Sequence, residues 1–519
     1  LWRSKLMSNF DFNNLFVLDL ANNHQGSVEH GLKIIKECGK MVRKHNIRAA
    51  MKFQFRQYDT FIHPDHLEGS DNIHIPRFLS TQLKLNEWRI LFDAVRDEGM
   101  LTMCTPFDNE SIPVISEMGF DIIKVASCSA KDWPLLEGIS RATLPIIAST
   151  GGLTISDIDN IVSFFGHRGN QLALMHCISV YPIPAEDFHL NHIDTLRDRY
   201  QNYTVGWSTH ENQDEIAPVQ IAMAKGARMF ERHVGYETND IKLNLYSSTP
   251  QQLDEWFKAY RYAEVLCGSK TDKIDRPITD IEKKSLEGLQ RGVFAKKELE
   301  EGALLTINDV YFAMPFVPGQ ISSESWIDGG IVVNKSFKIN EPIFPDNITI
   351  TKNVTNQVLK KSIHEFKAML NKASIILNSE FGVEFSHHYG AENFREVGAL
   401  IIDCINREYC KKLILVLPGQ KHPSHFHKRK EETFQVLTGV FESVIDGHHR
   451  IMNPGETALV QPGVWHEFWS KDGCIVEEVS TTHYNDDSVY SDKKINDLER
   501  TERKTIVKNW GRFELVEDS

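Results

Sequence analysis

The sequence predicts an α/β protein: a (β/α)8 TIM barrel, followed by a small β-rich module and an all-β barrel. Eight short apolar runs recur between Leu15 and Val234, and stretches of helical character separate them. Each run ends in polar residues, as parallel strands do when they deliver side chains to one mouth of a barrel. Further along, short and closely spaced strand-like runs from about 383 to 479 indicate an all-β sandwich or barrel.

The eight runs carry the chemistry of the first barrel at their C-terminal ends. In (β/α)8 barrels the active site lies at this end of the strands, so the pattern predicts an enzyme. The runs are LFVLDLANNH, AAMKFQ, LTMCTP, DIIKVAS, PIIAST, LALMHC, TVGWSTH and MFERHV.

A chain of 519 residues is too long for one hydrophobic core, and we expect three domains. The barrel is expected over 10–285 and the β-rich module over 286–352, with the all-β barrel and its helical entry over 353–519. The polar stretch SKTDKIDRPITDIEKKS reads as a linker between the first two. The first six residues, LWRSKL, precede Met7 and are expected to be vector sequence or a misassigned start.

Composition excludes several classes of protein. The net charge of -13 and the lack of a long basic run argue against nucleic acid or an anionic membrane as partner, although a local lysine cluster could still bind a small anion. No apolar run reaches the roughly 18 residues of a membrane span. The eight cysteines form no CxxC pair and no signal peptide precedes them, which predicts a cytoplasmic protein.

Two lysines at strand ends indicate an anion site. Lys52 and Lys124 follow the second and fourth runs, and would repel one another in one mouth unless an anion lies between them. A single lysine in this place more often only reaches solvent. Both together, with Thr105, Ser127 and Ser149 nearby, favour a cradle for phosphate or carboxylate.

Two histidines at neighbouring strand ends indicate a metal site. His210 follows the seventh run and His233 ends the eighth, where neutral imidazoles can bind one divalent ion and leave positions for substrate. A lone histidine here is more often structural, but the pair favours the ion. Asp19, on the first run, supplies a further acid or base.

In their order along the chain, these motifs resemble the sialic acid synthase family. The resemblance covers about Phe16 to Gly268, and the β-rich module that follows resembles the family's antifreeze-like SAF domain. The motifs that carry it are NNHQGS, MKFQ, CTPF, IKVAS, ASTGG, the YP of SVYPIP, GWSTH and ERHV.

The resemblance implies that phosphoenolpyruvate condenses with an open-chain aldose, such as an N-acylhexosamine, to give a nonulosonic acid and phosphate. It implies a divalent ion, Mn²⁺ or Mg²⁺, on His210 and His233, and proton transfer by Asp19 or Glu231. The residues implied around phosphoenolpyruvate are Lys52, Thr105, Lys124, Ser127, Ser149 and Ser208, and those around the acceptor are Gln54, Phe107, Tyr181, Glu231 and Asp240.

Three departures from the family leave the acceptor open. Asp19 stands where the family has Glu, and Ser179 where it has Asn. The SAF-domain Arg that contacts the acceptor's N-acyl group falls at Met314, before Pro315. Because that Arg reaches the partner subunit's site, the resemblance also implies a domain-swapped homodimer.

The C-terminal block carries a second metal pattern. His425, His427 and Glu432 have the spacing H-x-H-x4-E, and His466 follows in PGETALVQPGVWHEF. Alternation places the first two on one face of a strand, so the four can converge on one transition-metal ion inside a small barrel. This block resembles the cupin family. A sugar isomerase or epimerase and a sugar-binding module are both compatible with it.

Two other readings of the whole chain remain. The first barrel could be a metal-dependent sugar isomerase or aldolase that makes no use of phosphoenolpyruvate. Alternatively, the chain could be a carbohydrate-binding scaffold without turnover, although Lys52, Lys124, His210 and His233 argue against this.

Overall fold

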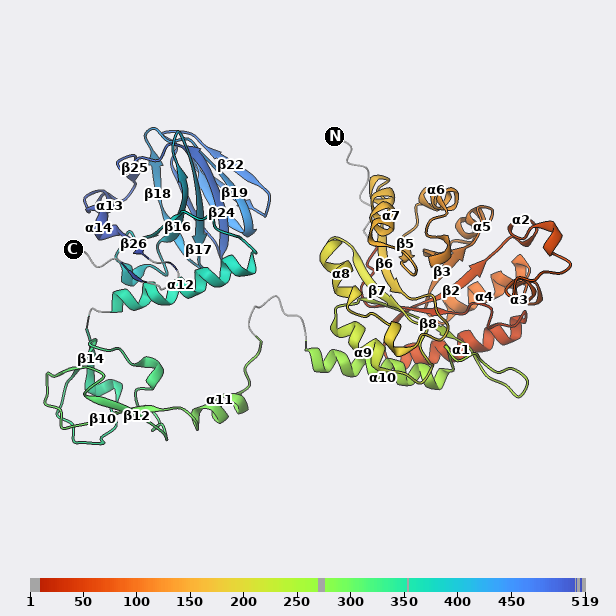
Figure 1. Ribbon diagram of the computed structural model, residues 1–519, viewed down its shortest axis with the longest axis horizontal. Helices are drawn as coiled ribbons and strands as arrows, with labels where there is room; N and C mark the ends of the chain where they lie inside the picture. Colours follow the sequence, from red (N-terminus) through yellow and green to blue (C-terminus); the bar gives the residue numbers. More distant parts are fainter. Residues whose placement is uncertain (1–9, 269–275, 352–353, 509, 511–513, 516–519) are drawn as a thin grey trace. The chain divides into compact units, whose positions relative to one another are not determined.

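The computed structural model describes residues 10–268, 276–351, 354–508, 510 and 514–515. The chain divides into two compact units, Leu1–Asp275 and Arg276–Ser519 (Figure 1). The N-terminal LWRSKL lies outside the described residues.

The first unit is a closed barrel of eight parallel strands, which confirms the predicted fold class. Each strand pairs with the next, and β1 also pairs with β8, which closes the ring. A ninth strand, β9 (Ser247–Ser248), adds to β8. The barrel strands are β1 (Leu15–Asp19), β2 (Arg48–Phe55), β3 (Leu101–Pro106), β4 (Ile122–Val125), β5 (Ile146–Ser149), β6 (Leu172–Cys177), β7 (Thr204–Ser208) and β8 (Met229–Val234).

Helices surround the strands (Figure 1). Several begin at a residue whose hydroxyl accepts a backbone N–H of the first turn, as Ser27, Thr154 and Thr249 do. The helices are α1 (Val28–Lys44), α2 (Tyr58–Phe61), α3 (Ile75–Ser80), α4 (Leu85–Asp97), α5 (Ser111–Met118), α6 (Trp133–Arg141), α7 (Ile155–His167), α8 (His192–Arg199), α9 (Ala217–Ala224) and α10 (Pro250–Cys267). Short 3₁₀ turns lie at Pro64–His66, Ser127–Ser129 and Ala185–Asp187.

Strand alternation separates a packed floor from a polar mouth. On β1, Leu15 and Val17 belong to a buried apolar cluster that also includes residues of β2 to β6 and β8, whereas Phe16 and Leu18 pack in the larger core with the helices. Asp19 is the next residue of the Leu15 and Val17 series, so it faces into the barrel above that floor. The floor consists of Phe12, Leu15, Val17, Ala50, Met103, Ile122, Ile147, Ala173, Met175 and Met229.

The second unit begins with helix α11 (Asp280–Glu287), which lies in the stretch predicted as a linker. The hydroxyl of Thr279 accepts the N–H of Glu282 and begins this helix. The β-rich module that follows has its own small core around Val293, Leu305 and Ile331. Its strands are β10 (Gly292–Ala295), β11 (Leu304–Leu305), β12 (Val310–Ala313), β13 (Ile331–Val333) and β14 (Ile348–Ile350), with 3₁₀ turns at Ser323–Ser325 and Pro345–Asn347.

The predicted all-β barrel is present after helix α12 (Val354–Lys372). An eight-stranded and a five-stranded sheet enclose its core (Figure 1, blue). The strands are β15 (Gly382–Ser386), β16 (Ala399–Asn406), β17 (Tyr409–Val416), β18 (Lys421–His427), β19 (Glu432–Gly439), β20 (Phe441–Ile445), β21 (His448–Met452), β22 (Thr457–Val460), β23 (His466–Trp469), β24 (Cys474–Thr481), β25 (Ser488–Tyr490), β26 (Lys504–Lys508) and β27 (Glu514–Leu515). Short turns of helix lie at Ala391–Asn393, α13 (Lys493–Asn496) and α14 (Arg500–Arg503). In the described residues, no helix is long and apolar enough to cross a membrane.

Candidate functional site

A cavity of about 520 Å³ occupies the mouth of the first barrel, at the C-terminal ends of its strands. It gathers the predicted residues from all eight strand ends, with Asp240 as the exception. Its lining includes Asp19, Lys52, Gln54, Thr105, Phe107, Lys124, Ser127, Ser149, Tyr181, Ser208, His210, Glu231 and His233.

A buried carboxylate joins the two lysines at the centre of this mouth. Glu231 Oε1 lies 2.7 Å from Lys52 Nζ, and Glu231 Oε2 contacts Lys124 Nζ. Lys52 Nζ also lies 2.9 Å from Asp19 Oδ2. The sequence predicted a bound anion between the two lysines, and in the structure the protein's own carboxylate, Glu231, lies there.

The same contacts set the protonation states. Burial alone would raise the pKa of Glu231, but the charges of Lys124 and Lys52 outweigh it and hold this pKa well below its usual range. Burial favours the neutral form of Lys52, yet Asp19 and Glu231 raise the pKa of its amine. Burial lowers the pKa of Lys124, against the opposing charge of Glu231. Glu231 is thus an ionised carboxylate and a weak base.

His210 and His233 lie side by side with their ring centroids 5.4 Å apart. His210 Nδ1 lies 2.9 Å from the carbonyl of Ile178, which fits an Nδ1–H donor and makes Nε2 the candidate ligand atom. His233 Nε2 lies 3.4 Å from Asp19 Oδ2. Burial lowers the pKa of His233, so its imidazole is neutral, as a metal ligand must be. The two imidazoles are therefore candidate ligands of a divalent ion, with Asp19 beside one of them.

Hydroxyl groups line the mouth above the apolar floor. Ser127 Oγ accepts the N–H of Gly151 at 3.1 Å. A Cβ at Gly151 would lie 2.5 Å from Ser179 Oγ and 2.6 Å from Ser127 Oγ, so only glycine allows this approach. Thr105 Oγ1 is buried and makes no hydrogen bond with any described residue. It is therefore available to a ligand.

The rim is aromatic on one side. The ring of Tyr181 lies 4.1 Å from His210 and 5.1 Å from Tyr246, centroid to centroid. On another side Gln54 accepts from Arg56, whose guanidinium lies 3.9 Å from the ring centroid of Phe107. Aromatic ring faces with a few polar groups beside them are typical of small-molecule binding sites.

The sequence did not anticipate every residue of the mouth. Asn244 and Tyr246 line it, but they lie in the loop before β9, which no apolar run announces. Cys177 also lines it: burial would raise the pKa of its thiol, but the hydrogen bond and charge of His210 lower it. Asp240, predicted near the acceptor, is exposed and lies outside the lining.

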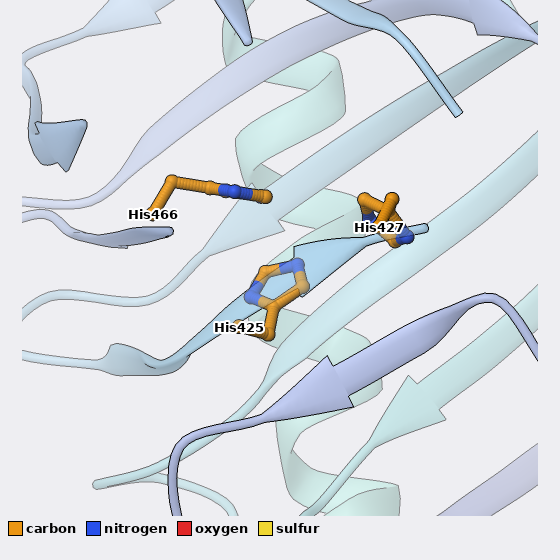
Figure 2. A group of neighbouring side chains, drawn as sticks. All are labelled: His425, His427 and His466. Atoms are coloured by element: carbon orange, nitrogen blue, oxygen red, sulfur yellow. The ribbon is translucent and has the colours of Figure 1, made fainter. Parts of the chain in front are cut away.

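The C-terminal barrel brings three predicted ligands together. The ligand atoms of His425, His427 and His466 lie within 4.8 Å of one another and all three side chains are buried (Figure 2). His425 pairs with His466 across β18 and β23. The Nδ1 atoms of His425 and His466 lie 3.0 and 3.1 Å from the carbonyls of Pro423 and Val464, which leaves each Nε2 free.

Glu432 reaches the same point from β19, in the other sheet. Its Oε1 lies 3.2 Å from His427 Nε2, and its Oε2 lies 3.2 Å from His466 Nε2. Neither Glu432 Oε2 nor His466 Nε2 makes a hydrogen bond within the described chain, although both are buried. A metal ion would satisfy both atoms, so these residues fit one.

Two family models match the chain, one in each compact unit. A model of the NeuB family matches residues 43–272, and a cupin domain model matches residues 412–475. A solved structure from Chromobacterium violaceum, of a protein assigned to spore coat polysaccharide biosynthesis, is 38% identical with a TM-score of 0.62. The match covers 65% of this chain and 99% of that one.

Two curated relatives are synthases. The N-acetylneuraminate-9-phosphate synthase of Drosophila melanogaster is 26% identical over 369 residues, which cover 64% of this chain and 95% of the relative. The pseudaminic acid synthase of Campylobacter jejuni is 28% identical over 323 residues, which cover 59% and 89%.

Proposed function

Because the chain belongs to the NeuB family and carries a cupin domain, we propose that its first barrel is a nonulosonic acid synthase. It condenses phosphoenolpyruvate with an open-chain aldose and releases phosphate. The observation that carries the proposal is the pair of buried lysines at the mouth, Lys52 and Lys124, beside the histidine pair His210 and His233. This arrangement provides an anion site next to a metal site in one cavity.

Phosphoenolpyruvate carries a phosphate and a carboxylate, and the mouth offers donors for both. Lys52 and Lys124 supply charge, and the hydroxyls of Ser127, Ser149 and Ser208 supply neutral donors on the same lining. Glu231 keeps both lysines charged and in place when they are buried. The site thereby holds the enol carbon of phosphoenolpyruvate towards the aldehyde of the acceptor.

His210 and His233 would hold a divalent ion, Mn²⁺ or Mg²⁺, whose contribution when bound is to polarise the aldehyde oxygen of the acceptor. The C3 carbon of phosphoenolpyruvate forms a bond to the aldehyde carbon, whose oxygen takes up a proton, and water adds at C2 with loss of a proton. The C2–O bond to phosphate then breaks, phosphate leaves, and the C2 hydroxyl loses its proton to give the carbonyl.

Asp19 is the better candidate to accept the proton of the attacking water. Both oxygens of Glu231 contact lysines, and its lowered pKa makes it a weak base. Asp19 is the other carboxylate of the mouth and lies beside His233. In this proposal Lys52, Lys124 and Glu231 position phosphoenolpyruvate, and Asp19 moves the proton.

Gln54, Phe107, Tyr181 and Tyr246 would face the acceptor sugar from the rim. An N-acylhexosamine fits the apolar ring faces. Met314 of the β-rich module is 57% exposed and has no charge to offer an acyl group, so the acceptor's acyl contact would differ from that of the sialic acid synthases.

The assembly and its compartment are further parts of the proposal. The module over 286–352 would act as a SAF domain that covers the barrel of a partner subunit in a homodimer. All eight cysteines are free thiols, which fits a reducing cytoplasm. The cupin domain would hold a second, transition-metal ion and act on, or bind, a related sugar.

Phosphate release tests the reaction. The protein is incubated with phosphoenolpyruvate, Mn²⁺ and a panel of hexosamines, N-acylhexosamines and neutral aldoses. We expect phosphate release that depends on the acceptor, with a new C–C bond visible by mass spectrometry. A folded, metal-loaded protein that consumes no phosphoenolpyruvate with any acceptor would contradict the proposal and favour a sugar isomerase, an aldolase or a binding scaffold.

A further inference from the structure

We propose that the pocket beside the cupin histidines binds the carboxylate head of a small organic acid, held between the metal ligands and three buried lysines. The inference concerns a site separate from the barrel mouth and does not depend on the proposed reaction. It rests on the residues that line the pocket, on their charge and on the size of the space.

Lysines line this pocket from three different segments. Lys412 lies on β17, Lys430 just before β19, and Lys504 at the start of β26. Their side chains are 5%, 3% and 15% exposed. Buried lysines are rare unless they are paired, and these three bring ammonium groups to one lining from three segments.

Each of these lysines has a carboxylate partner, but only two of the four carboxylates line the pocket. These two are Glu432 and Glu478, and Lys430 contacts both. Glu432 is also the carboxylate that fits the ion. Lys412 and Lys504 pair with Asp403 and Glu384, at 3.0 and 2.6 Å, but these two acids do not line the pocket.

A histidine of the lining shows the effect of the lysine charges on the pocket. Burial, and then the charges of Lys412, Lys430 and Lys504, lower the pKa of His483 to about 2. Its Nδ1 is buried and makes no hydrogen bond to another described residue, and the same holds for Nδ1 of His422, which is 4% exposed. Both histidines line the pocket, so unpartnered polar atoms and buried lysines meet in one place.

The size of the space selects the part of the ligand that enters. The pocket encloses about 40 Å³, enough for a few water molecules or one carboxylate with an adjacent oxygen, and too small for a sugar ring. A 2-keto or 2-hydroxy acid would place its carboxylate among the lysines and its 2-oxygen towards the metal ligands. The rest of the molecule would extend through the open side.

The test uses the full chain with a His233→Ala change, so that Co²⁺ occupies only the cupin histidines. Pyruvate is titrated while the visible spectrum of the cobalt is recorded, and pyruvamide serves as a neutral probe of the same shape. We expect pyruvate to change the spectrum and pyruvamide to bind at least about tenfold more weakly, because hydrogen bonds to a charged carboxylate are stronger than those to a neutral amide.

Two lysine variants test whether the buried lysines bind the carboxylate of pyruvate. Lys412→Met leaves Asp403, which is 38% exposed, and Lys504→Met leaves Glu384 paired with Arg500. Both should therefore fold, and each should weaken pyruvate binding about tenfold or more. Lys411→Met is the matched control: it is the neighbouring lysine on β17, is 42% exposed and pairs with Glu477, so it should bind pyruvate normally.

Three outcomes would overturn the proposal. The cobalt spectrum of a folded protein does not respond to pyruvate; the two lysine variants bind it as tightly as Lys411→Met; or inorganic phosphate binds more tightly than pyruvate, which would make this a phosphate site. If Lys504→Met is unfolded by circular dichroism, Lys504→Arg, which keeps the charge, must fold and bind pyruvate.

Discussion

At the scale of single residues, the hydroxyl of Thr105 is expected to contribute to substrate binding but not to the stability of the fold. This hydroxyl is buried at the mouth without a hydrogen-bond partner among the described residues, so the folded protein gains nothing from it. Thr105→Val keeps the shape and removes only the hydroxyl. We expect an unchanged or slightly raised melting temperature and a KM for phosphoenolpyruvate that rises about tenfold or more, from the loss of one hydrogen bond to a charged ligand.

A second threonine of the same strand provides the comparison. Thr102 Oγ1 donates to Asp121 at 2.8 Å, outside the mouth. Thr102→Val should therefore lower the melting temperature and leave the KM unchanged. If both valine variants change the KM alike, the Thr105 hydroxyl has no special contact with phosphoenolpyruvate.

Gly151 leaves room for two hydroxyls of the same mouth because it has no side chain. In Gly151→Ala the new methyl group would lie within 2.6 Å of the hydroxyls of Ser127 and Ser179, so both must turn away. Such overpacking costs about 1–3 kcal/mol. We expect a lower melting temperature and a raised KM for phosphoenolpyruvate in steady-state assays of phosphate release. An unchanged KM would show that these hydroxyls do not contact the substrate.

Residues that obey strand alternation could be predicted, and loop residues could not. Asp19, Lys52 and Glu231 each continue the inward-facing series of a recognisable apolar run, so their place at the mouth follows from the period of two. Tyr246 precedes a strand of only two residues and has no such signal. The ion pairs of Glu231 with both lysines were also not predicted, because spacing along the chain does not give distances between strands.

At the scale of elements, the C-terminal strands show the same limit. The runs from β15 to β24 alternate clearly, and the structure confirms the all-β block that they predict. β26 lies beyond it and pairs with β15, which is about 120 residues earlier in the chain. Its first residue, Lys504, lines the cupin pocket, and this position could not be predicted from the sequence because it depends on the pairing of β26 with β15.

Two buried histidines in barrel elements make stability depend on pH. His24, in the turn after β1, and His176, on β6, each have a pKa that burial lowers from 6.5 to about 4. Between these values the unfolded chain binds protons that the folded chain does not. Stability is therefore full above about pH 6.5 and falls as the pH drops towards 4.

Each histidine should contribute on the order of 1–2 kcal/mol to the loss of stability between pH 7 and pH 5. Urea unfolding followed by tryptophan fluorescence measures it, since His24 packs on Trp88 and His176 on Trp207. His24→Gln and His176→Gln should each flatten the pH dependence of the unfolding free energy. Equal slopes in the variants and the parent would mean that these side chains do not remain neutral when buried.

At the scale of the whole molecule, the chain carries candidate metal ligands in each of its two compact units. The mouth of the barrel has two imidazoles next to a carboxylate, whereas the cupin has three imidazoles and Glu432. The first set would leave more positions open to substrate, and the second would hold an ion with more protein ligands. The ions, and the consequences of losing them, should therefore differ.

Removal of one ligand from each set tests whether the units act independently. His233→Ala should abolish barrel metal binding and reduce phosphate release about a hundredfold or more, since polarisation of a carbonyl by a metal is worth several kcal/mol. His427→Ala should remove the cupin ion and leave phosphate release unchanged, because His427 lies in the other compact unit. Metal analysis should find two ions per chain in the parent and one in each variant. If His427→Ala loses phosphate release while circular dichroism shows an intact fold, the cupin ion acts on the barrel reaction and the units are coupled.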